Sequence, residues 1–152
     1  MPINPDFKDL LRALSAEPVE YLIVGAYAVT YYSEPRYTKD IDIWVRPSLE
    51  NAHRLWRALE SFGAPLGEVR VEDFTKTDVV YQIGIEPNRI DIIMDVAGVD
   101  FEQAWGGREQ STYGGVPVNF IGKQELIQAK RAAGRAQDML DLERLEVPPP
   151  RP

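Results

Sequence analysis

Three aspartates stand at spacings that suit metal chemistry. Asp40 and Asp42 open the segment 40–45, in which polar and apolar residues alternate, and Asp91 lies in a second such segment, 89–96. Side chains alternate across a strand, so we predict that Asp40 and Asp42 share one face. If the two strands are neighbours in one sheet, Asp91 meets that pair on the same side.

Carboxylates at close range repel one another unless a cation lies among them. Mg²⁺ (or Mn²⁺) prefers oxygen ligands and keeps coordination positions open for water and substrate phosphates. Such a site can align a nucleoside triphosphate (NTP) and activate an acceptor hydroxyl. A chain with no cysteine and one histidine, His53, can supply this chemistry because no protein nucleophile is needed. The alternative is that Asp-x-Asp is the solvated face of an amphipathic strand.

The remaining pattern predicts the elements that must position these aspartates. Helices are expected over residues 5–16, 26–32, 48–62 and 123–145 (the last broken near Gly134), and strands over 21–24, 40–45, 79–85, 89–96, 109–113 and 116–121. Ser48 is the expected N-cap of the helix that runs to Phe62. Its expected buried side comprises Leu49, Ala52, Leu55, Trp56 and Leu59. The fold class is therefore α/β (α+β), a mixed sheet covered by helices.

Gly25 joins the first strand to the second helix. Glycine lets backbone N–H groups approach a phosphate, and a helix N-terminus adds a favourable dipole. An ordinary tight turn is the alternative for this glycine.

Composition restricts the function classes. The formal net charge of −7 argues against nonspecific DNA or RNA binding, which normally needs a basic surface. Without cysteine there is no disulfide or cysteine-based zinc site. We find no stretch resembling a membrane span or signal peptide and expect a cytoplasmic protein. Residues 1–147 are predicted to form one domain, and 148–152 a disordered proline-rich tail.

Two motifs carry a family resemblance. Val24-Gly-Ala-Tyr-Ala-Val29, followed by Pro35-Arg-Tyr-Thr-Lys-Asp-Ile-Asp-Ile43, resembles the first motif of the DNA polymerase β-type nucleotidyltransferase superfamily. The Arg-x-Thr-x-Asp-x-Asp form is most similar to the AbiEii-like branch, which includes toxins of bacterial toxin–antitoxin systems. Arg89-Ile-Asp-Ile92 resembles the strand that bears the third carboxylate, and the stretch 126–142 resembles the branch's helical motifs.

The resemblance implies a nucleotidyltransferase-like fold with C-terminal helices and an enzyme that moves a nucleoside monophosphate (NMP) from an NTP to a hydroxyl or phosphate acceptor on protein, RNA or a small molecule. The implied roles are catalysis and metal binding for Asp40, Asp42 and Asp91, and nucleotide binding for Gly25, Ala26, Arg36, Thr38 and Lys130. A toxin or antitoxin partner is also implied.

Some residues leave alternatives open. Ala26 stands where the superfamily usually has glycine or serine, so a catalytically lapsed binding or regulatory module, such as an antitoxin, is the second interpretation. Trp44 shares the predicted face of Asp42 and either stacks on a base or shields the site. Asp138 and Asp141 either belong to the helical motif or make helix-surface contacts with Arg135 or Arg144.

Overall fold

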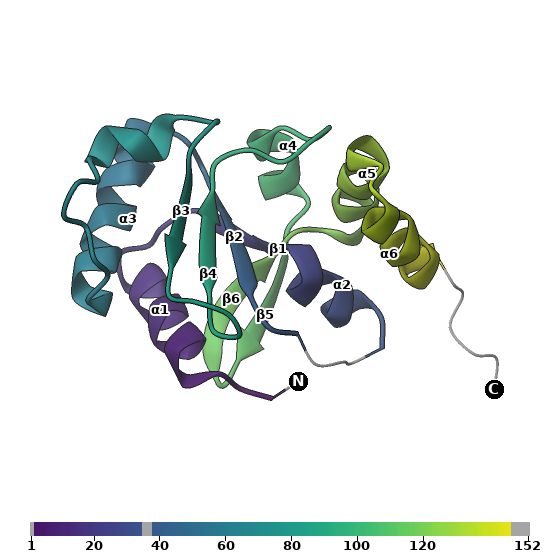
Figure 1. Ribbon diagram of the computed structural model, residues 1–152, viewed down its shortest axis with the longest axis horizontal. Coiled ribbons are helices and arrows are strands. Elements are labelled where there is room, and N and C mark those ends of the chain that lie inside the picture. Colours follow the sequence, from purple (N-terminus) through teal and green to yellow (C-terminus); the bar gives the residue numbers. More distant parts are fainter. Residues whose placement is uncertain (1, 35–37, 147–152) are drawn as a thin grey trace.

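The computed structural model describes residues 2–34 and 38–146 (Figure 1). Arg36 and the predicted tail at 148–152 lie outside the described residues. Within the described ranges, no helix combines the length and apolarity needed to cross a membrane.

A six-stranded sheet forms the centre of the fold, in the order β3-β4-β2-β1-β6-β5. The strands are β1 (Tyr21–Val24), β2 (Ile41–Val45), β3 (Val80–Ile83), β4 (Ile90–Ile93), β5 (Glu109–Tyr113) and β6 (Val116–Phe120). The β2–β4 and β1–β6 pairs are parallel, and the other three pairs are antiparallel. The predicted mixed sheet and fold class are confirmed.

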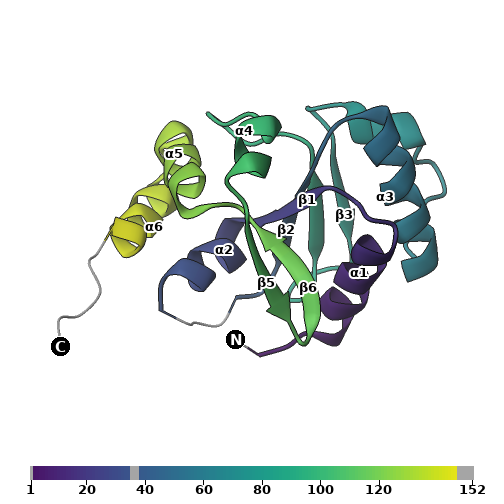
Figure 2. The same cartoon turned by 180° about the vertical axis from the view of Figure 1, so that it is seen from behind.

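Helices lie on both sides of this sheet. On one side, α1 (Pro5–Ala16) packs against α3 (Leu49–Phe62), and on the other α2 (Gly25–Tyr32) packs against α5 (Lys123–Ala133) and α6 (Ala136–Glu146). The two groups stand at opposite ends of the molecule in Figure 1 and exchange sides in Figure 2. Two short helices, η1 (Val71–Thr75) and α4 (Phe101–Gly106), were not predicted, because five or six residues are too few to show a helical period.

Local capping explains where the long helices begin and end. The Ser48 side chain accepts a hydrogen bond from the Asn51 N–H, as predicted, and Gly63 ends α3 in the left-handed conformation. Gly134 has the same conformation at the break between α5 and α6. The prediction that Leu49 is buried is wrong, since it is 52% exposed. Leu49 is the first residue of α3, and the buried residues of that helix start at Asn51.

Asn51 ties α3 to the ends of two strands. Its side chain is buried; it accepts a hydrogen bond from the Glu20 N–H (2.8 Å) and donates to the carbonyls of Glu20 and Arg46 (3.0 Å each). Glu20 precedes β1 and Arg46 follows β2, so the Asn51 amide holds together one end of the β1–β2 pair.

We expect Asn51→Ala to lower the free energy of unfolding by about 3 kcal/mol, because buried backbone groups lose their partners. Urea unfolding monitored by circular dichroism would measure this. His53→Ala, an exposed change in the same helix, should stay within about 0.5 kcal/mol. An Asn51→Ala protein as stable as the His53 control would contradict the role given to this amide.

Candidate active site

Strand register brings the predicted carboxylates together. Asp42 of β2 and Asp91 of β4 are direct partners in the parallel pair, so their side chains leave the same face of the sheet. Asp40 lies immediately before β2. The three aspartates thus form one acidic cluster along the neighbouring strands β2 and β4, as the sequence predicted.

Arg89 already balances part of this charge. Its Nε lies 3.0 Å from Asp91 Oδ1, and its Nη2 lies 3.4 Å from Asp40 Oδ2. Its backbone N–H also donates to Asp40 Oδ1 at 3.2 Å. The hydrogen bonds that Arg89 donates to Asp91 and the charge of that carboxylate raise the pKa of Arg89 above its ordinary value. Arg89 lies two residues before Asp91, so alternation puts both side chains on one face of the strand, but the sequence analysis did not identify Arg89 as the counter-ion.

Asp42 is the most constrained of the three. Val24 pairs with Asp42 across the β1–β2 ladder, which sets the carboxylate against Gly25. Gly25 has φ of +67°, and a Cβ added there would lie 2.2 Å from Asp42 Oδ2. Burial, followed by the nearby charges of Asp91 and Asp40, raises the pKa of Asp42 to about 7. Gly25 is therefore required by its backbone conformation and by the close approach of this carboxylate.

A cavity of about 400 Å³ opens beside Asp42, and we call it the Asp42 cavity. Among the predicted residues, the cavity brings together Gly25, Asp42 and Lys130. Its other charged lining residues are Asp95, Arg135 and Asp138, and apolar residues of β4, α5 and the end of β6 complete the wall. Asp95 and Arg135 had not been singled out as site residues. Ala26 does not appear among the described residues that line this cavity, and Thr38 lines a different one.

Lys130 is held between two buried aspartates. Its Nζ lies 3.2 Å from Asp138 Oδ1 and 3.1 Å from Asp141 Oδ2. Both aspartates are at most 3% exposed, so neither lies on the helix surface. The expected i,i+3 contact of Arg135 with Asp138 is present at 2.7 Å. The hydrogen bond from Arg135 is the main cause that lowers the pKa of Asp138 to about 2.

Trp44 does not reach a ligand. It is 1% exposed, and its ring meets that of Phe101 edge-on at 5.1 Å. Of the two alternatives for Trp44, stacking on a base is wrong, because α4, which was not predicted, covers this end of the strand face.

The donor atoms suit a hard divalent cation, although they do not form a closed cage. Asp40, Asp42 and Asp91 offer carboxylate oxygens, the ligands that Mg²⁺ prefers. Within residues 2–34 and 38–146, no three histidine or acidic side chains are grouped closely enough to hold a metal as they stand. Arg89 bridges Asp40 and Asp91 and so supplies the positive charge that a metal would bring.

Solved structures share this architecture. A Thermotoga maritima protein with a provisional nucleotidyltransferase assignment matches at 17% identity over 93% of both chains (TM-score 0.63). The lincosamide antibiotic adenylyltransferase LnuA, solved with lincomycin, matches at 13% identity over 96% of this chain and 98% of its own (TM-score 0.60). The antibiotic-resistance factor ANT(2'')-Ia matches at 15% identity over 92% of this chain and 80% of its own (TM-score 0.61). No family model and no curated protein sequence matches. The chain has the nucleotidyltransferase fold.

Asp138 should make stability depend on acidic pH. Its folded-state pKa of about 2 lies below the ordinary 3.8, so its stabilising effect is present above pH 4 and is lost as the pH falls towards 2. We expect Asp138→Asn to cost about 2 kcal/mol at pH 7 and little at pH 2, measured by urea unfolding. Asp9→Asn, an exposed change with a similar i,i+3 partner, is the control. If Asp138→Asn lowered the free energy of unfolding as much at pH 2 as at pH 7, the lowered pKa assigned to Asp138 would be contradicted.

Asp42 should destabilise the metal-free fold. Its folded-state pKa of about 7 lies above the ordinary 3.8, so its cost is largest above pH 7 and disappears as the pH falls towards 4. We expect Asp42→Asn to raise stability by about 1–2 kcal/mol at pH 8 and by less at pH 5. Thermal unfolding at pH 8 and at pH 5, in a chelating buffer, would measure both changes in stability. A destabilised variant at pH 8 would show that the carboxylate is not under electrostatic strain.

Proposed function

We propose that this chain is an Mg²⁺-dependent nucleotidyltransferase that moves an NMP from an NTP to a hydroxyl or phosphate acceptor. The observation that carries the proposal is the in-register pair Asp42 and Asp91, with Asp40 immediately before β2. Of these three aspartates, Asp42 lines the cavity that Lys130 also lines. The nucleotidyltransferase fold of the structural neighbours supports the same reaction class.

Asp40, Asp42 and Asp91 are the residues that would hold Mg²⁺ or Mn²⁺. When bound, the cation neutralises triphosphate charge and makes the acceptor hydroxyl more acidic. Arg89 must then give up at least part of its bridge between Asp40 and Asp91, since the same oxygens serve both partners. We propose that Arg89 turns towards the reacting phosphate, where its charge remains useful.

The Asp42 cavity suits the nucleotide. The N-terminus of α2 opens on it at Val24 and Gly25, and no side chain caps that terminus. Its backbone N–H groups and helix dipole favour a phosphate there. Lys130 and Arg135 add cations along the wall, and the apolar residues accept the base or ribose. Ala26 and Thr38, and Arg36 outside the described residues, keep their predicted nucleotide roles as part of this proposal.

The charge of the cavity supports metal dependence. Its lining carries three aspartates (Asp42, Asp95, Asp138) against two cations (Lys130, Arg135), and Lys130 is already paired with Asp138 and Asp141. A triphosphate that enters without a divalent cation is therefore repelled. The bound species should be the metal–NTP complex.

In the proposed reaction, the acceptor oxygen attacks the α-phosphorus while the bond from that phosphorus to the β-phosphate oxygen breaks. Pyrophosphate leaves with the bonding electrons, and the hydroxyl proton passes to the carboxylate cluster. Lys130 and Arg135 stabilise the charge that develops on the phosphate oxygens.

The acceptor and biological setting are further proposals. The structural neighbour LnuA is an antibiotic adenylyltransferase, and ANT(2'')-Ia has been solved in complex with adenylyl-2''-tobramycin. These neighbours favour a small-molecule acceptor over protein or RNA. The segment 36–42 resembles the AbiEii-like motif. On that motif alone, we also propose a toxin–antitoxin partner.

Thermal unfolding in four conditions tests the proposal: protein alone, with Mg²⁺, with NTP, and with both. We expect a large shift only with both, of about 2.7 kcal/mol at a ligand concentration 100-fold above Kd. Asp40→Asn/Asp42→Asn should remain folded and lose this shift. Equal shifts in the two proteins would place the metal elsewhere, and no shift with any NTP would refute nucleotide binding.

Nucleotidyl transfer itself can be measured by incubating the protein with cell lysate and each of four α-labelled NTPs in turn. Label should reach an acceptor with one NTP, and Asp91→Asn should abolish the labelling. Labelling that persists in Asp91→Asn would contradict the catalytic assignment even if the nucleotide binds.

A further inference from the structure

One buried carboxylate joins the two cations of the Asp42 cavity. Asp138 is fully buried near the start of α6, which packs against α5 (Figures 1 and 2). Its Oδ1 accepts hydrogen bonds from Lys130 Nζ at 3.2 Å and from Arg135 Nη2 at 3.3 Å. Its Oδ2 accepts from Arg135 Nε at 2.7 Å and from the Arg135 backbone N–H at 3.1 Å. Both cationic side chains are therefore fastened to the same acceptor.

The two cations need such an acceptor to stay on the cavity wall. Like charges this close repel each other, and ordering a long side chain costs conformational entropy. The Lys130 side chain is 12% exposed, whereas that of Arg135 is 75% exposed and has room to turn into water. The hydrogen bonds to Asp138 and the charge of that carboxylate raise the pKa of Arg135 above its ordinary value. Asp138 thus opposes the departure of Arg135 from the wall.

Both cations keep donors for a ligand. An ammonium group has three N–H donors, and Lys130 directs two of them to Asp138 and Asp141. A guanidinium has five, of which Arg135 gives one from Nε and one from Nη2 to Asp138. Within residues 2–34 and 38–146, the remaining donors of these two side chains have no protein acceptor. Because Nζ and Nη2 share one oxygen, they lie close enough to donate to two oxygens of one phosphate group.

Granted the proposed function, in which the Asp42 cavity holds the NTP, we propose that Asp138 is a positioning residue that sets specificity for the triphosphate. It holds Lys130 and Arg135 so that both donate to one phosphate group beyond the α-phosphate. The α-phosphate lies at the carboxylates that hold the cation, so the β- and γ-phosphates are the groups that reach the wall formed by α5 and α6.

A structural role for Asp138 makes a different prediction. Loss of a structural carboxylate lowers the folded fraction of the protein, which weakens the apparent binding of every ligand of the cavity by the same factor. Loss of positioning weakens only the binding of phosphates beyond the first. The ratio of the NMP dissociation constant to the NTP dissociation constant, which we call the triphosphate preference, therefore separates the two roles.

Isothermal titration calorimetry in the presence of Mg²⁺ measures this preference. The probes are the α,β-methylene analogues of ATP, GTP, CTP and UTP, with AMP, GMP, CMP and UMP as the matching monophosphates. For the base that binds best, we expect Asp138→Asn to lower the triphosphate preference about tenfold, because an amide offers one acceptor oxygen where the carboxylate offers two. Asp138→Glu keeps the charge that pairs with Lys130 and moves the oxygens by one methylene, so it should lower the preference about threefold.

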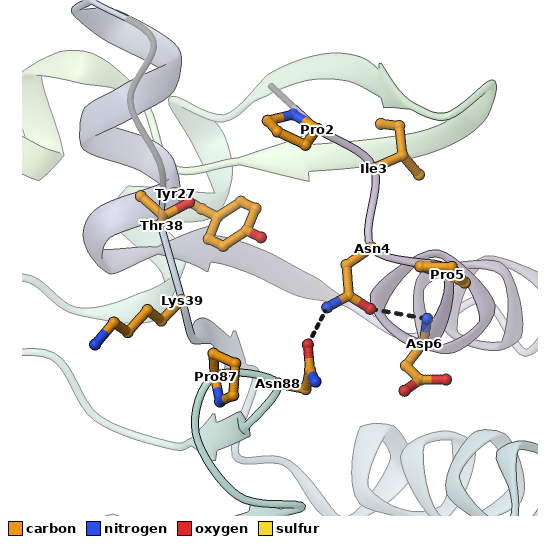
Figure 3. Close-up of a pocket in the computed structure, with 10 residues that line it drawn as sticks. All are labelled: Pro2, Ile3, Asn4, Pro5, Asp6, Tyr27, Thr38, Lys39, Pro87 and Asn88. Atoms are coloured by element: carbon orange, nitrogen blue, oxygen red, sulfur yellow. Dashed lines mark hydrogen bonds between the residues drawn. The ribbon is translucent and has the colours of Figure 1, made fainter.

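A mutant cycle shows whether Asp138 acts through the two cations. In the Lys130→Met/Arg135→Met background, Asp138→Asn should change the triphosphate preference by no more than about twofold, since no cation is left to position. Asp6→Asn is the matched control, because Asp6 is exposed and lines a different cavity, at the N-terminal segment (Figure 3). It should leave the preference unchanged.

Four outcomes discriminate. An unchanged preference in both Asp138 variants would overturn the positioning role. A higher preference in Asp138→Asn would do the same, since the carboxylate would then be competing with the phosphate for the cations. A tenfold loss that persists without Lys130 and Arg135 would show that Asp138 acts by another route. If no triphosphate analogue bound the wild-type protein, the proposed function itself would be refuted.

Discussion

The parallel pairing of β2 with β4 is the constraint on which the rest of the site depends. The backbone ladder fixes Asp42 beside Asp91, and the two carboxylates cannot move apart without breaking it. Burial weakens the screening that water would give, so the repulsion is strong. Burial of the carboxylate, followed by the charge of Asp91, raises the pKa of Asp42. Arg89 pairs with Asp40 and Asp91, and the charge of Lys130 lowers the pKa of Asp42, so both cations reduce the cost of this repulsion.

The antiparallel pairing of β1 with β2 adds a second restriction. It sets Val24 opposite Asp42, so the next residue, Gly25, must leave room for the carboxylate. Alanine here would meet the Asp42 oxygen and would also be strained at a φ of +67°. The same glycine starts α2, whose uncapped terminus faces the cavity. Gly25 therefore meets three requirements: it follows β1, it leaves room for the Asp42 carboxylate, and it starts α2.

Sequence periodicity was sufficient to predict the carboxylates but not their surroundings. Alternation placed Asp40, Asp42 and Asp91 correctly, because strand geometry maps spacing directly onto a face. It could not decide between the two alternatives for Trp44, because alternation does not show that α4 covers that end of the face. Likewise, the sequence left Asp138 open between a motif residue and a surface contact with Arg135, because spacing alone does not show that the side chain is buried where α6 packs. Contacts between elements distant in sequence leave no periodic signal.

Charge balance also limits which states the site can adopt. In the metal-free state, Arg89 balances Asp40 and Asp91, while Asp42 favours its protonated form. Lys130 offers little surplus charge, because Asp138 and Asp141 both pair with it. Under the proposed function, a nucleotide would therefore enter without a large electrostatic penalty only as a complex with a divalent cation. Asp40, Asp42 and Asp91 would hold that cation, and Arg89 would then contact the phosphate. On this proposal, the acidic chain accepts an acidic substrate because positive charge arrives with the ligand.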